Sequence, residues 1–426
     1  MSETRASSRA TENAAARRAL EEACGRVEDA TEADLVDGVQ PDLVARPTST
    51  AEVSEVMRAA AAHGLVVVPR GRGTKITWGA PPARADVVVD TSGLDQVLEH
   101  AAGDLVAGAQ AGTRLAALQE VVAGAGQRLA IDETVPGASI GGTIAAATSG
   151  PGRVATGTVR DLLIGVTVVR ADGVVAKAGG RVVKNVAGYD LGKLVIGSFG
   201  TLAVVTEAMF RLHPEPDARS YVSVPVADPA EAHRRTQDVV HSQVVAGAVE
   251  LDWSAGAGTL TLMLQGVARG VEGRTSTALR VLGDSATAST RAPEGWGRYP
   301  WDLGATGDDR RVDMKLAFAL SGLSDVLTAV DAAGVPVRLR GSAGAGVVYA
   351  SMPGDTDVAQ AGAVVERLRA TCAKHGGSLV VLDAPAAVKR GLDVWGPVPA
   401  LDLMRRVKDQ FDPDHRLAPG RFVGGI

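Results

Sequence analysis

Glycine clusters are the residues of this 426-residue chain whose spacing most suggests chemistry. The first cluster, RGRGTK at 70–75, follows a short apolar run. Glycine permits positive φ angles, and the successive amides of such a loop can hold phosphate oxygens. The pattern G-x-G-x-x-G stays incomplete because Ile76 takes the place of the last glycine, which disfavours a Rossmann site. The sequence therefore predicts a phosphate-binding loop of another kind.

The second cluster, PGASIGGTIAAATSG at 136–150, joins paired glycines to a run of small residues. Such a run is typical of a tightly packed helix, and its glycines again let the backbone approach a pyrophosphate closely. A third glycine-rich stretch spans 179–200, but its segment GYDLGKL at 188–194 lacks the spacing and the hydroxyl residue of a P-loop. Two candidate anion cradles in one region favour a phosphate-bearing cofactor more than either cradle alone.

Taken in order, the three clusters resemble the FAD-binding domain of the vanillyl-alcohol oxidase and p-cresol methylhydroxylase (PCMH-type) flavoproteins, over residues 37–216. Within that superfamily, the stretches SGPGRVATGTVRDLLIGV, GGRVVKNVAGYDLGKL and IGSFGTLAVVTEAMFRLHP are similar to the FAD-binding subunit of glycolate oxidase, the GlcE type. The segment FDPDHRLAPGRF at 411–422 is similar to the tail of that family, which returns to the flavin domain. Residues 217–400 carry little of the resemblance.

The resemblance implies FAD as the cofactor. Two loops would form the walls around the pyrophosphate, further residues would continue beneath the cofactor, and the third cluster would pass the adenosine end by backbone contacts. These positions are Arg70, Gly71, Arg72, Gly73, Thr74, Lys75, Pro136, Gly137, Ser139, Ile140, Gly141, Gly142, Thr148, Gly150, Gly157, Arg160, Asp161, Gly200, Val204 and Val205. Many relatives attach the flavin through a His or Cys of the first loop. Because this loop has neither, we predict noncovalent FAD.

Oxidation of a 2-hydroxy acid requires a cation for the carboxylate and a base for the hydroxyl group, while a hydride passes to the flavin. The seven histidines form no pair at metal-ligand spacing, and the histidine-rich metal motif of the sister subunit and of related D-lactate dehydrogenases is absent. We therefore expect no metal site. The candidates for a catalytic or substrate role are Lys184, Asn185 and Tyr189, with Arg181, Arg338 and Arg340 as further cations. A hydrogen-bonded turn beneath the flavin is the structural alternative for Lys184 and Tyr189.

Regular elements must hold these loops in place. The capping-box text STAE at 49–52 predicts a helix that ends near residue 63, and a strand at 65–68 then leads into the first glycine loop. A further strand is expected at 86–90 and a helix at 113–122. The β-branched runs after residue 161 predict a hairpin that turns at Ala171-Asp172-Gly173.

The proline-rich joint HPEP at 213–216 predicts a domain boundary. Beyond it we expect strands at 221–226, 247–253 and 259–266, a helix at 274–282, and a helix, a strand pair and a helix within 324–377. The loop at 294–307, rich in Trp, would line a site or pack against the neighbouring domain. The predicted fold is α+β. Its parts are an N-terminal arm and helix (1–36), a two-subdomain PCMH-type FAD-binding domain (37–216), an α+β, ferredoxin-like cap for substrate or partner (217–400), and a tail that returns to the FAD domain (401–426).

Composition sets limits on the protein class. The length exceeds that of a single core, and 46% hydrophobic with 22% charged residues indicate a folded, soluble protein. The net charge of -5 disfavours a nucleic-acid partner. The first twenty residues lack the apolar core of a secretory signal, and no stretch of 18 apolar residues occurs. We therefore expect a cytoplasmic protein that meets a membrane only through partners.

Two cysteines are too few to hold an iron–sulfur cluster in this chain alone, so electrons must pass to another carrier. The leading hypothesis is an FAD-dependent oxidoreductase acting on CH–OH groups. It would be the FAD subunit of a glycolate (2-hydroxy acid) dehydrogenase or oxidase complex, with a second flavoprotein subunit and an iron–sulfur subunit as partners. The alternatives are a stand-alone FAD-dependent dehydrogenase of another alcohol or hydroxy acid, and a noncatalytic flavin-binding assembly subunit.

Overall fold

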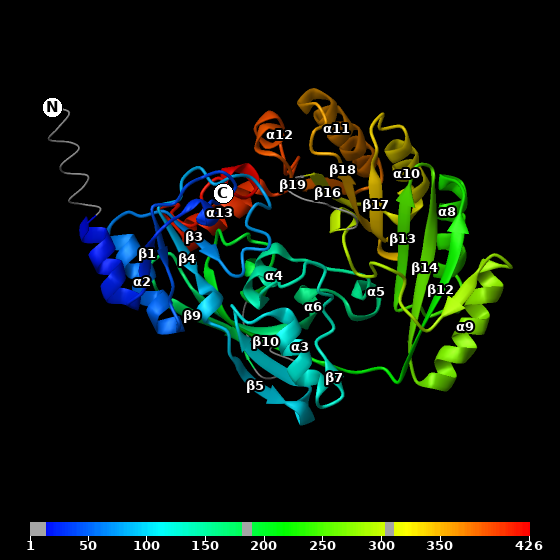
Figure 1. The fold of residues 1–426 in the computed structure, drawn as a ribbon, viewed down its shortest axis with the longest axis horizontal. Coiled ribbons are helices and arrows are strands. Elements are labelled where there is room, and N and C mark those ends of the chain that lie inside the picture. The colour runs from blue at the N-terminus through cyan, green and yellow to red at the C-terminus, as the bar shows by residue number, and fades with distance from the viewer. Residues whose placement is uncertain (1–13, 181–189, 303–310) are drawn as a thin grey trace.

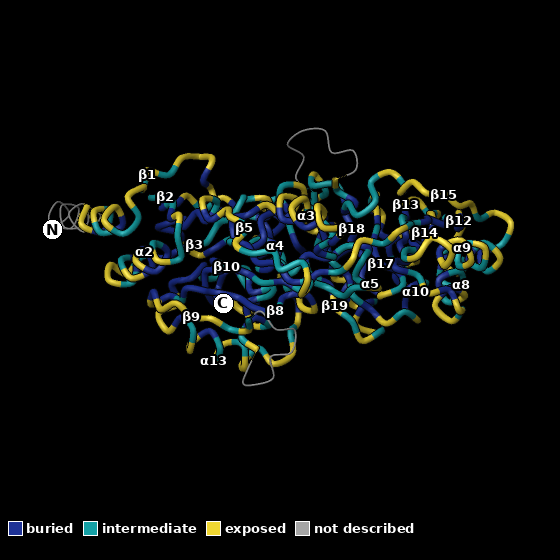
Figure 2. Tube along the Cα trace, turned by 90° about the horizontal axis from the view of Figure 1, so that it is seen from below, coloured by how far each residue is buried: buried dark blue, intermediate teal, exposed yellow. Residues whose placement is uncertain are grey.

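The computed structural model describes residues 14–180, 190–302 and 311–426, and it has two halves (Figure 1). One half holds the N-terminal sheets and the C-terminus, and the other is built on one large sheet. Buried residues follow the strands of both halves, while exposed residues follow the outer helices and loops (Figure 2). In the described part of the chain, no helix has the length and apolar character that crossing a membrane requires.

The first sheet positions the glycine loop at 70–75. Its strand order is β1-β2-β4-β3, with bounds Val27–Asp29, Leu43–Ala45, Val87–Asp90 and Val67–Arg70. Helix α2, Thr50–Ala62, packs its apolar face against this sheet, and Ser49 Oγ caps it by accepting a hydrogen bond from the amide of Glu52. The Glu52 carboxylate accepts from the amide of Thr48, one residue before the expected partner. The predicted helix and both predicted strands are confirmed within two residues.

The second sheet positions the other glycine clusters. It is antiparallel, in the order β5-β6-β10-β8-β9, with bounds Val97–Ala101, Val106–Gln110, Val204–Arg211, Leu163–Val169 and Val175–Gly179. Strands β8 and β9 are the predicted hairpin, and Val169 pairs with Val175 at its closed end. The short strands β7 and β11 (Gln127–Arg128 and His213–Pro214) form a separate pair. The helices between the strands of this sheet are α3 (Leu115–Ala123), α4 (Ile140–Ala146), α5 (Arg153–Thr156), α6 (Val159–Leu162) and α7 (Gly192–Val195).

The large sheet has eight strands in the order β15-β12-β14-β13-β17-β18-β16-β19. Their bounds are Thr287–Ser289, Ala218–Val226, Ala257–Gly266, Ala248–Ser254, Arg338–Ser342, Val347–Met352, Val312–Ala317 and Ser378–Asp383. The helices between them are α8 (Pro229–Val240), α9 (Ala268–Leu282), α10 (Leu323–Asp331) and α11 (Val358–Lys374). The chain therefore runs twice through β-α-β-β-α-β, the ferredoxin-like motif. The α+β prediction is confirmed, and the ferredoxin-like motif expected in this part of the chain occurs twice, joined where β13 pairs with β17.

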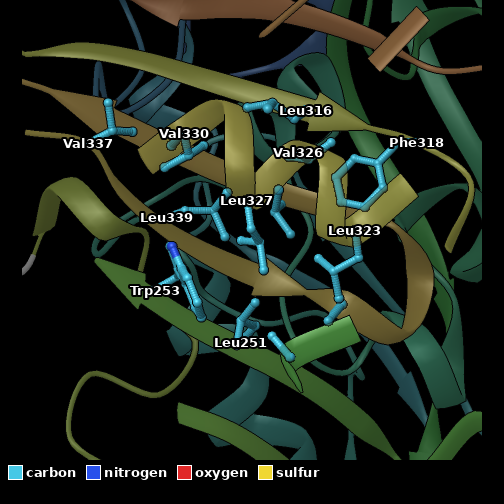
Figure 3. Packing of buried hydrophobic residues seen from close by; sticks show 14 of the residues in the cluster. Leu251, Trp253, Leu316, Phe318, Leu323, Val326, Leu327, Val330, Val337 and Leu339 are labelled. Atoms are coloured by element: carbon cyan, nitrogen blue, oxygen red, sulfur yellow. The ribbon is translucent and has the colours of Figure 1, made fainter. Parts of the chain in front are cut away.

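Alternation along these strands gives the large sheet two different faces. Leu251 and Trp253 on β13 point into the core beneath the helices, beside Leu339 of β17 (Figure 3). Glu250, which directly precedes Leu251, belongs to the opposite face, and α5 of the first half lies beside β13 on that side (Figure 1). Polar side chains of the large sheet are thus turned toward the first half.

The C-terminal tail returns to the first half. After α12 (Ala386–Gly391) and α13 (Leu401–Phe411), the amide of Val67 donates to the carbonyl of Arg416, and the amide of Ala418 donates to the carbonyl of Val67. The Lys408 ammonium is fully buried, where it donates to the Asp412 carboxylate at 2.7 Å and to the carbonyls of Thr201 and Leu417. This buried ion pair fixes the tail beside β3.

Candidate functional site

An open cavity of about 760 Å³ lies where the glycine loops meet. Four segments form its walls: the loop after β3, the start of α4, the segment before β10, and the C-terminal tail. Its lining residues are Pro69, Arg70, Gly71, Arg72, Gly73, Thr74, Lys75, Ile76, Thr91, Ser139, Gly141, Gly142, Ala145, Ala146, Ser198, Phe199, Gly200, Ala203, Val204, Val205 and Arg421. The three sequence clusters therefore do meet in space, around one cavity.

Because glycine has no side chain, the two glycine-rich walls of the cavity can approach each other closely. A Cβ on Gly71 would overlap Ser139 Oγ, the hydroxyl that caps α4 by accepting from the amide of Gly142 at 3.2 Å. A Cβ on Gly141 would lie 2.9 Å from the Cβ of Ala111, closer than such atoms approach in proteins. Glycine at both positions thus sets the width of the cavity.

The arginines of the first loop are already engaged within the protein. Arg70 forms ion pairs with Asp34 and Asp90, each at 2.9 Å, which hold the end of β3. Arg72 Nε donates to the carbonyl of Gly112 at 3.1 Å. Both side chains fix the loop, and their positive charge is largely committed to these contacts.

Lys75 is the exception in this loop. Its ammonium is buried, donates to Thr74 Oγ1 at 3.2 Å, and has no carboxylate of the described chain within ion-pair distance. A Cβ built on Gly142 would lie 3.9 Å from Lys75 Nζ, so the ammonium stands at the second glycine wall. Burial lowers the pKa of Lys75 to about 8, and the charge of Glu133 opposes this only in part. A buried cation without a counter-ion that lines a cavity is suited to bind an anion.

Arg421 brings a second cation to the cavity from the tail. Its side chain is buried and donates to the carbonyls of Ile76 and Trp78, but its Nη1 atom has no partner. Burial lowers the pKa of Arg421 to about 10, with the charges of Asp37 and Asp383 opposing. Together with Lys75, it gives the cavity the charge that a pyrophosphate needs. The apolar lining suits an aromatic ring system. The residues present therefore fit FAD.

Other predicted positions lie outside this cavity. Ile140 is packed in the apolar core, and Asp161 caps α6 by accepting from the amide and hydroxyl of Thr158. Gly157 lies against Asp161 with a φ of 77°. The predicted residues that do not line the cavity are Pro136, Gly137, Ile140, Thr148, Gly150, Gly157, Arg160 and Asp161. The catalytic candidates Lys184, Asn185 and Tyr189, and Arg181, lie outside the described residues.

A second cavity, of about 290 Å³, lies between the first half and the large sheet. Gly150, one of the predicted positions, lines it, and so does Arg340 of β17, whereas Arg338 is exposed at the start of that strand. Tyr299 and Tyr349 form one wall, with their ring centroids 4.3 Å apart.

The described part of the Trp-rich loop borders a cavity and packs against the first half. Tyr299 lines the second cavity, while Trp301 and Tyr299 pack on Trp78 of the first half with ring centroids 6.3 and 6.1 Å apart. Among residues 14–180, 190–302 and 311–426, no group of three or more His, Cys, Asp or Glu side chains is arranged to hold a metal ion.

Comparison with known proteins identifies the cofactor domain. Residues 41–179 match the family model described as the FAD binding domain. Glycolate oxidase subunit GlcD of Bacillus subtilis is 31% identical over 211 residues, 49% of this chain and 45% of that protein. D-lactate dehydrogenase of Archaeoglobus fulgidus is 33% identical over 183 residues, 43% of this chain and 41% of that protein. The matches thus span less than half of these relatives.

Solved structures establish the fold of the remainder. Alkyldihydroxyacetonephosphate synthase aligns with a TM-score of 0.68 over 90% of this chain and 78% of its own, at 18% identity. The Physcomitrella patens BBE-like 1 protein aligns with the same TM-score over 94% of this chain and 97% of its own, at 16% identity. The chain therefore has the fold of PCMH-type FAD-binding proteins, with an FAD binding domain related to those of glycolate oxidase and D-lactate dehydrogenase. The named glycolate oxidase relative is GlcD, and the narrower GlcE relation stays a prediction.

Proposed function

We propose that this protein is an FAD-dependent oxidoreductase that acts on the CH–OH group of a small 2-hydroxy acid. The observation that carries the proposal is the cavity at the glycine loops, where the buried Lys75 ammonium stands at the second glycine wall with no counter-ion among the described residues. Relatives named for glycolate, D-lactate and D-2-hydroxyglutarate support the substrate class.

Lys75, Arg421 and the amides of the loop at 70–75 would hold the pyrophosphate, and the backbone at Gly200, Val204 and Val205 would lie along the adenosine. Bound FAD supplies the hydride acceptor for the CH–OH carbon. Among the residues that the structure describes, the lining of the cavity contains no His, Cys or Tyr, which supports noncovalent attachment. Acid precipitation should leave the yellow colour in the supernatant. A yellow pellet would contradict noncovalent binding.

Lys184, Asn185 and Tyr189 remain our proposed catalytic residues. Thr148, Gly150, Gly157, Arg160 and Asp161 remain proposed supports beneath the cofactor. The domain limits (1–36, 37–216, 217–400 and 401–426) and the cytoplasmic location likewise remain proposals.

We propose the GlcE type of glycolate oxidase subunit as the closest functional class, working with a second flavoprotein and an iron–sulfur partner. The two cysteines support this dependence: Cys372 lies in the core of the large sheet, Cys24 near the N-terminus, and neither lines the FAD cavity. Without its own cluster, the chain needs an external electron acceptor.

A stand-alone dehydrogenase is the second candidate, and the second cavity favours it because a substrate could be held within this chain. The two are separated by adding glycolate, D-lactate and a panel of alcohols anaerobically to the FAD-loaded chain while recording flavin absorbance. Bleaching by the chain alone supports the stand-alone enzyme, and bleaching only after partners are added supports the complex. A chain that binds FAD but is never reduced, with or without partners, would be an assembly subunit. Failure to bind FAD at all would refute the proposed function.

A further inference from the structure

The loop at 75–79 has one side on the FAD cavity and the other side on the large sheet. Lys75 and Ile76 line the cavity. At the far end of the loop, the amide of Gly79 donates to the carbonyl of Leu382 in β19 at 2.8 Å. The segment that presents the buried ammonium to the cofactor is therefore attached directly to the other half of the molecule.

A buried cluster of charges joins the middle of this loop to the large sheet. Lys389 of α12 has a fully enclosed side chain, and its ammonium lies 2.7 Å from Asp37 and 2.9 Å from Asp383. The same ammonium donates to the carbonyl of Thr77, and Thr77 Oγ1 donates to the Asp383 carboxylate at 2.6 Å. Asp37 and Thr77 belong to the first half, whereas α12 and β19 extend the large-sheet half and lie beside the first half (Figure 1).

These contacts must form and break together. Moving the large sheet away would separate the Lys389 ammonium from Asp37 and from the Thr77 carbonyl, which is costly for a buried charge. Thr77 is also tied to the cavity side of the loop, because the amide of Trp78 donates to the carbonyl of Lys75 at 3.1 Å. A displaced Thr77 would therefore displace the backbone that carries Lys75.

The second cation of the cavity depends on the same cluster. Arg421 donates to the carbonyls of Ile76 and Trp78, on either side of Thr77. Burial lowers the pKa of Arg421, and the charges of Asp37 and Asp383 oppose this lowering. One of these two carboxylates comes from each half, so the docked large sheet supports the charge that faces the cofactor.

We propose that Lys389 is a positioning residue for the cofactor, and that FAD binding is thermodynamically coupled to docking of the large sheet on the loop at 75–79. Lys389 does not line the cavity and acts through Thr77, Asp37 and Asp383. Coupling is reciprocal, so FAD should strengthen the docking by the factor by which docking strengthens FAD binding. The proposal rests on FAD as the ligand of the cavity and is independent of the substrate.

Fluorescence titration of the full chain with FAD tests the coupling. Lys389→Met should weaken FAD binding by about fivefold to hundredfold, the usual range for coupled sites. Thr77→Val is a milder variant that keeps the shape of the side chain and loses the hydroxyl that Asp383 accepts, so it keeps the test open if Lys389→Met does not fold. It should weaken FAD binding about threefold to tenfold. Thr77→Ser retains the hydroxyl and should bind FAD as the unaltered chain does.

Leu327→Ala is the matched control for loss of stability. Leu327 lies on α10 in the core of the large sheet (Figure 3), so its truncation should destabilise the chain without weakening FAD binding. Hydrogen exchange at the Gly79 amide measures docking itself, because that amide bonds across the two halves. FAD should slow this exchange in the unaltered chain and in Leu327→Ala, and much less in Lys389→Met.

The coupling is wrong if Lys389→Met and Thr77→Val bind FAD as tightly as the unaltered chain, or if Leu327→Ala weakens binding as much as they do. Equal losses in Thr77→Ser and Thr77→Val, or equal protection of the Gly79 amide in all variants, would also overturn it. These outcomes leave the proposed function intact. An FAD-binding chain that shows the expected losses but is reduced by no hydroxy acid, with or without partners, leaves the coupling intact and removes the redox function. An unaltered chain without affinity for FAD would refute both.

Discussion

Replacing Lys75 with methionine should stabilise the protein without FAD and at the same time weaken FAD binding. The pKa of Lys75 is lowered from 10.5 to about 8 by burial, so below pH 8 the folded state carries a charge that it disfavours. At about 1.4 kcal/mol for each pKa unit, the apoprotein should gain about 3 kcal/mol at pH 7 when the ammonium is removed. FAD should lose a charged hydrogen bond, which corresponds to about tenfold to hundredfold in Kd.

Urea unfolding of the apoprotein and fluorescence titration with FAD measure the two effects separately. The pH dependence checks the cause. Between pH 8 and 10.5 the unfolded chain keeps the proton on Lys75 and the folded chain does not, so the stability of the unaltered protein should rise with pH. The advantage of Lys75→Met should therefore shrink over that interval.

Lys389 supplies a matched control, because it is buried too but has counter-ions. Its ammonium lies 2.7 Å from Asp37 and 2.9 Å from Asp383. Lys389→Met removes the cation from these carboxylates and should destabilise the protein by about 3–5 kcal/mol. If Lys75→Met also destabilised the apoprotein, or left the affinity for FAD unchanged, the assignment of Lys75 as a cation reserved for the cofactor would be refuted.

Three further predictions concern the walls, the tail and the second cavity. Gly71→Ala should weaken FAD binding, because the new methyl overlaps Ser139 Oγ; adding Ser139→Ala should recover part of the affinity in a fluorescence titration. Lys408→Met should destabilise the protein by about 3–5 kcal/mol in urea, since Asp412 loses its buried cation, whereas exposed Arg405→Met should change little. Glu250 keeps its proton in the folded state up to about pH 8, while the unfolded chain loses it near 4.5, so this residue makes stability fall as pH rises between those values. Glu250→Gln should reduce that fall when urea midpoints are compared at pH 5 and pH 8.

Local patterns in the sequence were sufficient to predict individual helices and hairpins. The serine cap and apolar spacing of α2, and the Asp-Gly turn between β8 and β9, depend on residues within a few positions of each other. The doubled ferredoxin-like motif depends instead on the pairing of β13 with β17, about ninety residues apart, for which no local pattern exists. The number of motifs in the large sheet therefore could not be predicted, and three of its strands, β15, β16 and β19, were not predicted either.

The residues of the candidate site also fall into two groups: those that the local sequence indicates and those that only long-range contacts reveal. The glycine walls could be predicted because a glycine cluster can be recognised in the sequence without knowing which segment lies opposite it in the fold. The sequence does not indicate Arg421, although its tail segment resembles that of the family, because its contact with Ile76 spans 345 residues. Phe199 and Thr91 were missed because nothing about a single Phe or Thr indicates that it borders a cavity.

Three buried lysines show why chemistry is harder to predict than fold. Lys75, Lys389 and Lys408 are all nine-tenths or more enclosed, and nothing in their residue type distinguishes them. Lys408 finds its carboxylate one helical turn away, and Lys389 finds one of its carboxylates 352 residues away at Asp37. Among the described residues, Lys75 alone of the three has no such partner. Because burying an unpaired charge costs several kcal/mol, its retention is best explained by an anion that the protein binds, and the FAD binding domain around it supplies that anion.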